Sequence, residues 1–128
     1  MEFSELIARA QAVLSPRALS DDASAGSVAA AILTREGHVY TGVCIDTACS
    51  MGFCAEHAAA AAMVTAGEHR IARVVAVGSR DRGVMPPCGR CREFLSQLAQ
   101  DNGEAEVLVA DGVVVRLKDL LPYSGRDT

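Results

Sequence analysis

The segment that most restricts the fold is residues 71–78, which read Ile-Ala-Arg-Val-Val-Ala-Val-Gly and form an almost unbroken apolar run. A strand with one face in water alternates between apolar and polar residues. A strand covered on both faces does not alternate, and it is typical of sheets with helices packed on each side. Residues 71–78 therefore predict a central strand in a layered α/β fold.

The rest of the chain supplies the elements that would surround this strand. Helical spacing of apolar residues, or a high alanine content, predicts helices over residues 3–14, 54–66 and 88–100, with a short helical turn at 118–121. Further strands are predicted over residues 28–34, 39–46, 106–110 and 113–117, the first two joined by a turn that contains Gly37. We expect a three-layer α/β/α architecture around a central mixed sheet of about five strands.

Length and composition set limits on the class of protein. With 128 residues, half of them apolar, the chain can bury one core, so we expect a single domain over residues 1–128. The net charge is −4 and the arginines are scattered, which favours a small-molecule substrate over a nucleic acid polymer.

The sequence predicts no membrane span, because it contains no run of eighteen apolar residues. The acidic start Met1-Glu2-Phe3-Ser4-Glu5 is unlike a signal peptide. The odd number of cysteines, five, indicates reduced thiols in the cytoplasm, some of them on a metal.

Two short motifs each begin a predicted helix directly after a loop: Cys54-Ala55-Glu56 and Pro87-Cys88-Gly89-Arg90-Cys91. A Cys-x-x-Cys pair at a helix start lets both sulfurs face one point, and Cys54 supplies a third thiolate. Zinc takes four tetrahedral ligands, so three protein ligands leave one position open to water. The ligand count therefore predicts one catalytic zinc ion per chain, held by Cys54, Cys88 and Cys91.

Glu56 is the predicted proton carrier of this site, because it lies two residues beyond Cys54 and can reach beside the water. Zinc lowers the pKa of such a water towards neutrality. A carboxylate there can take a proton from the water and return it to a ring nitrogen and then to a leaving amine. The combined pattern, Cys-x-Glu followed by Pro-Cys-x-x-Cys, is typical of zinc deaminases.

In these motifs the chain resembles the cytidine deaminase family in its small three-cysteine form. The resemblance covers nearly the whole chain and includes Thr41-Gly42 and Leu120-Leu121-Pro122. It implies zinc ligands at Cys54, Cys88 and Cys91, a proton shuttle at Glu56, and hydrolytic deamination of cytidine or deoxycytidine, a step of pyrimidine salvage. It also implies a homotetramer.

The chain departs from the family pattern where family members hold the substrate. An Asn-x-Glu pair that binds the ribose hydroxyls is replaced by Cys44 and Asp46, and Gly26 stands where an aromatic residue is usual. We take these three as candidate substrate-binding positions. The altered positions leave a second substrate class open, a modified cytosine nucleoside or a blasticidin-S-like antibiotic, because blasticidin-S deaminases have similar cysteine motifs. The sequence leaves open the roles of Cys49, His57 (an arginine in the family) and Arg90.

Two readings from other functional classes also remain. The zinc could be purely structural if Cys44 or Cys49 closed the fourth position, although such a site has no use for Glu56. Alternatively, Cys88 and Cys91 could form a metal-free thiol–disulfide pair.

Overall fold

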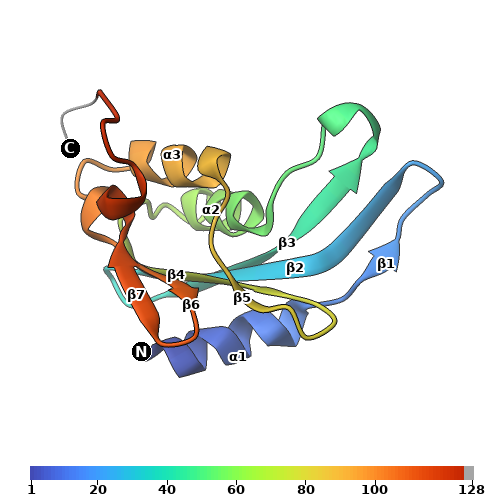
Figure 1. Ribbon diagram of the computed structural model, residues 1–128, viewed down its shortest axis with the longest axis horizontal. Helices are drawn as coiled ribbons and strands as arrows, with labels where there is room; N and C mark the ends of the chain where they lie inside the picture. Colours follow the sequence, from blue (N-terminus) through green and yellow to red (C-terminus); the bar gives the residue numbers. More distant parts are fainter. Residues whose placement is uncertain (126–128) are drawn as a thin grey trace.

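A mixed β-sheet forms the middle layer of the structure, a computed structural model that describes residues 1–125 (Figure 1). The apolar run is confirmed as its centre: β4 (Ile71–Gly78) pairs antiparallel with β2 (Ala23–Thr34) and parallel with β6 (Glu106–Ala110). Outside these lie β3 (Val39–Thr47), next to β2, and β7 (Val113–Arg116), next to β6. The five predicted strands are therefore present, in the order β3-β2-β4-β6-β7.

Within residues 1–125 the sheet has seven strands rather than the expected five or so, because two very short strands pair with the start of β2 and the end of β4. β1 (Arg17–Ala18) pairs with the start of β2, before β4 reaches it, and β5 (Gly83–Met85) pairs with the end of β4, beyond β6. Strands of two and three residues are too short to leave a periodic pattern in the sequence. They fall in stretches that read as polar turn or loop.

Helices cover both faces of the sheet, which confirms the three-layer α/β/α architecture. α1 (Phe3–Val13) lies on one face, and α2 (Ala55–Thr65) and α3 (Gly89–Gln97) lie side by side on the other (Figure 1). Along β2, Ala29, Ala31 and Leu33 pack in the core beneath α1, whereas Ala30 and Ile32 pack beneath α2 and α3. This alternation is the period of two that a strand between two helical layers requires.

Short 3-10 helices complete the chain: η1 (Ala48–Ser50), η2 (Asn102–Glu104) and η3 (Leu117–Leu120), the last of which is the expected helical turn near the C-terminus. None of the helices in residues 1–125 has the length and apolar character needed to span a bilayer. Of the single domain expected over 1–128, residues 126–128 lie outside the described part.

The position of α2 depends on a glycine in β3. A Cβ atom on Gly42 would lie 2.4 Å from the backbone nitrogen of Ala59 and 2.6 Å from the Cβ of Ala58. Only a residue without a side chain allows this close approach of helix and strand. Because α2 begins next to Cys54, the same contact sets the position of one of the predicted zinc ligands.

Candidate active site

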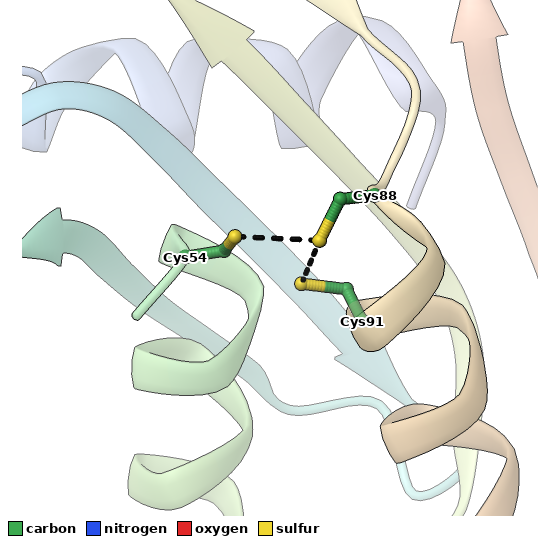
Figure 2. A group of neighbouring side chains, drawn as sticks. All are labelled: Cys54, Cys88 and Cys91. Atoms are coloured by element: carbon green, nitrogen blue, oxygen red, sulfur yellow. Dashed lines mark hydrogen bonds between the residues drawn. The ribbon is translucent and has the colours of Figure 1, made fainter. Parts of the chain in front are cut away.

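The three predicted zinc ligands meet at the adjacent starts of α2 and α3 (Figure 2). Cys54 and Cys88 are the N-cap residues of the two helices, and Cys91 lies in the first turn of α3. The Sγ atom of Cys88 is 3.4 Å from that of Cys54 and 3.5 Å from that of Cys91, and all three sulfurs lie within 4.8 Å of one another.

This spacing fits a zinc ion. With Zn–S bonds of about 2.3 Å, tetrahedral geometry places sulfur atoms about 3.8 Å apart, which is a few tenths of an ångström above the two shorter distances and inside the 4.8 Å limit for all three. Within residues 1–125, no fourth His, Cys, Asp or Glu belongs to the group, so neither Cys44 nor Cys49 closes the site. The three cysteines thus provide a site for one zinc ion per chain, with a free coordination position.

The protonation of the thiols explains why a cation is needed here. Burial raises the pKa of Cys54 to about 11, and burial together with the nearby Glu56 carboxylate raises the pKa of Cys91. Burial also opposes ionisation of Cys88, but hydrogen bonds with backbone N–H groups at the start of α3 and with the neighbouring thiols outweigh it, and the pKa of Cys88 is lowered. Three thiolates this close repel one another, so a divalent cation is required to hold all of them ionised.

Glu56 lies in the first turn of α2 and is almost completely buried, with 4% of its surface exposed. Burial raises the pKa of its carboxyl, against an opposing effect of its own backbone hydrogen bond. It nevertheless lines the same cavity as Cys54 and Cys88. This carboxyl is shielded from bulk water, faces a ligand cavity and has a raised pKa. These properties suit a group that transfers protons.

His57, whose role the sequence left open, lies against the thiol cluster. Its Nδ1 atom is 3.3 Å from the Sγ of Cys91, and its ring stacks on Phe94 with centroids 4.1 Å apart and planes at 14°. Burial, aided by the charge of Arg90, lowers the pKa of His57, which favours the neutral ring. In that form Nδ1–H can donate to the sulfur and stabilise the thiolate without adding a full charge.

The cavity next to these groups has a volume of about 600 Å³, in the range of small-molecule sites. Cys44 and Asp46, two of the candidate substrate positions, lie on its wall. They are joined to each other and to Ser27: the Cys44 Sγ is 3.3 Å from the Ser27 Oγ and 3.8 Å from an Asp46 carboxylate oxygen. Cys44 is 6% exposed, so Asp46 presents the more accessible polar group.

Gly26, the third candidate position, is not brought to the cavity. It adopts a left-handed φ of 84°, and a Cβ there would lie 2.0 Å from the carbonyl oxygen of Ser15. The residue sits at a break in the pairing of β2 with β3, and the next residue, Ser27, lines the cavity instead. Of the residues left open, Arg90 lines the cavity, whereas Cys49 is exposed and does not belong to the described lining.

Several lining residues had no recognisable signal in the sequence, notably Ser27, Phe53, Arg82 and Met85. Arg82 and Met85 reach the cavity because β5 folds back along β4, and the Arg82 guanidinium is held by the carbonyls of Ser27 (2.8 Å) and Ser79 (3.1 Å). The sequence pattern predicts no strand over residues 83–85, so nothing in it links these side chains to the cysteines.

Comparisons with known proteins agree with this geometry. The family model of the cytidine and deoxycytidylate deaminase zinc-binding region matches residues 3–103. A cytidine deaminase of Mycobacterium tuberculosis (strain ATCC 25618 / H37Rv) is 35% identical over 98 residues, which are 75% of this chain and 70% of the relative.

Solved structures are similar over almost the whole length. Cytidine deaminase from Mycobacterium tuberculosis has a TM-score of 0.79 at 28% identity, with 96% of each chain covered. Its counterpart from Mycobacterium leprae has a TM-score of 0.77 at 26% identity, with 95% of this chain and 98% of that chain covered. The enzyme from Burkholderia pseudomallei has a TM-score of 0.73 at 28% identity, with 96% and 98% covered.

Proposed function

The chain belongs to the family of zinc-binding cytidine and deoxycytidylate deaminases, and from this premise we propose that it catalyses the hydrolytic deamination of a cytosine-type nucleoside. Cytidine or deoxycytidine would be converted to uridine or deoxyuridine, with release of ammonia. The observation that supports this most directly is that Glu56, a nearly buried carboxyl, opens on the same cavity as the thiol cluster.

In this proposal Cys54, Cys88 and Cys91 hold the zinc ion, and His57 supports the Cys91 sulfur through its ring N–H. When bound, zinc supplies the Lewis acidity that makes water nucleophilic at neutral pH. The helix starts favour the thiolates because backbone N–H groups and the positive ends of two helix dipoles face the sulfurs.

Glu56 moves the protons. Its ionised carboxylate accepts a proton from the attacking water and delivers it to the ring nitrogen next to the carbon that bears the amino group. It then takes the second proton from the hydroxyl group now on that carbon and delivers it to the amino group, which leaves as ammonia. Water supplies the oxygen of the product carbonyl, and no other co-reactant is needed. Burial favours the uptake of the proton, because the raised pKa makes the carboxylate a stronger base.

A second substrate class, a modified cytosine nucleoside or a blasticidin-S-like antibiotic, is favoured by the wall at Cys44 and Asp46. These side chains are shorter than those of the family's Asn-x-Glu pair, and a cavity of about 600 Å³ has room for a larger ligand. Two observations argue against a structural zinc site and a redox pair. Among the described residues the cluster has no fourth thiolate that would close a structural site, and Cys54 lies near both Cys88 and Cys91, the members of the supposed redox pair.

The test is incubation of the zinc-loaded protein with cytidine, deoxycytidine and blasticidin S, following the ultraviolet change on loss of the amino group. We expect turnover of at least one of them, and the relative kcat/KM values identify the substrate class. Absence of turnover of all three with zinc confirmed by metal analysis would rule out the proposed activity. Metal-free, readily oxidised protein would instead support the redox alternative.

We further propose that residues 1–128 form one domain that acts as a homotetramer in the cytoplasm, in pyrimidine salvage. The odd number of cysteines, three of them assigned to a metal, supports a reducing compartment, and the assembly rests on the family resemblance. Light scattering coupled to size-exclusion chromatography measures the assembly directly, and a monomer at micromolar concentration would contradict it.

A further inference from the structure

Phe53, directly before Cys54, occupies an unusual position for a large apolar residue. It lines the cavity and is 37% exposed. Among the aromatic residues that the structure describes in positions 1–125, it is the one on the cavity wall. The other four are engaged elsewhere or lie on the surface: Phe3 beneath Arg73, Tyr40 on Glu68, Phe94 against His57, and Tyr123 fully exposed.

The backbone of Phe53 is held in place by β3. Its N–H donates to the carbonyl of Ile45 at 2.9 Å, and its carbonyl accepts from the N–H of Ile45 at 3.0 Å. The preceding residue must be glycine, because a Cβ on Gly52 would lie 2.0 Å from the same Ile45 carbonyl. The aromatic ring is therefore carried by a backbone that is fixed before any ligand arrives, which reduces the entropy lost on binding.

The surroundings of Phe53 favour a flat, uncharged ligand surface. The zinc ligand Cys54 and the proton carrier Glu56 follow it in the chain, and Val28, Ala76 and Met85 give the cavity further apolar lining. The faces of an aminated heteroaromatic ring are the part of a nucleoside that such a wall binds well, through stacking on an aromatic side chain.

We propose that Phe53 is a specificity-determining residue, which binds the face of the substrate's heteroaromatic ring and holds the ring beside Glu56 and the thiol cluster. This inference rests on the proposed deaminase function. Ser27 and Asp46 on β2 and β3 are then left to contact the remainder of the substrate.

The test compares Phe53→Leu and Phe53→Tyr with the wild type, each loaded with zinc, using the nucleoside that the wild type deaminates best. Leucine keeps an apolar surface but loses the aromatic face, so KM should rise about tenfold while kcat stays within about twofold. Phe53→Tyr should retain the wild-type KM. Met51→Leu is the matched control, because Met51 precedes Phe53 by two residues on the same loop, is 78% exposed and is not part of the described lining.

An unchanged KM in Phe53→Leu would overturn the inference, and so would a loss of kcat alone, which would mean that Phe53 acts by positioning Cys54. If the wild type deaminates none of the nucleosides, the proposed function fails. Calorimetric titration of cytidine and uridine into the wild type and Phe53→Leu then tests whether Phe53 binds the ring. Binding about tenfold weaker in Phe53→Leu would support the inference. Equal affinity, or no binding by the wild type, would overturn it.

Discussion

Substitution of Gly42 by alanine tests whether the close contact between β3 and α2 supports both the fold and the metal site. The added Cβ would meet Ala59 N at 2.4 Å and Ala58 Cβ at 2.6 Å, whereas ordinary contacts begin near 3.4 Å. α2 must therefore move away from the sheet by about 1 Å, because neither backbone nor Cβ can rotate aside. Overpacking of this kind costs about 1–3 kcal/mol, which lowers Tm by about 4–12 °C for a domain of this size.

The same movement displaces Cys54 relative to Cys88 and Cys91, because α2 begins at Ala55. We therefore expect Gly42→Ala to lose zinc affinity as well as stability, and a misplacement of about 1 Å lowers kcat/KM by up to about a hundredfold. Thermal unfolding followed by circular dichroism, together with zinc competition by a chromogenic chelator, measures both effects. Gly103→Ala is the control, since its Cβ would lie 3.5 Å from that of Lys118, an ordinary contact. A Tm of Gly42→Ala equal to that of Gly103→Ala would mean that α2 accommodates the added methyl group without moving.

Three further predictions follow from contacts around the site and the core. His57→Phe keeps a ring for stacking but removes the donor to Cys91, 3.3 Å away, so zinc affinity should fall about tenfold; chelator competition checks this, and an unchanged affinity would exclude the hydrogen bond. Asn102→Ala should lower the free energy of urea unfolding by about 3 kcal/mol or more, because the buried amide pairs with the backbone N–H of Ile71 and the carbonyls of His69 and Leu95. A loss below about 1 kcal/mol would mean that these groups find other partners. The hydrogen bond from Arg70 lowers the pKa of Asp101, so the pair stabilises the fold above the ordinary carboxyl pKa and ceases to do so as the pH falls through the lowered value. Urea unfolding at a series of pH values should show a shallower acid limb for Arg70→Met, and identical limbs would contradict the linkage.

The long elements of the fold could be predicted from the sequence because their patterns are local. The apolar runs of β4 and β2 reflect burial that extends over many residues, and the helix starts at Cys54 and Cys88 coincide with motifs. The short strands β1 and β5 depend on pairing with residues distant in sequence. No local preference in two or three residues predicts such pairing.

The candidate site also has a part that local sequence motifs predict and a part that depends on contacts between distant residues. The cysteines come together because two helix starts meet, and the motif spacing already implies this. Gly26 was expected on the substrate side by analogy with an aromatic position, but its left-handed backbone at a break in the strand pairing turns Ser27 to the cavity instead. Phe53 and Arg82 lie on loops whose paths are set by bonds to Ile45, Ser27 and Ser79, which the sequence does not reveal.

The most direct test of the central claim is ammonia release from cytidine and deoxycytidine by the zinc-loaded wild type and by Glu56→Gln, with zinc measured in the same samples. Glutamine occupies nearly the same volume but cannot accept and return a proton. We expect both proteins to hold one zinc ion per chain and the variant to lose activity by a factor of about 10³ or more. A zinc-loaded Glu56→Gln that releases ammonia at nearly the wild-type rate would contradict the account.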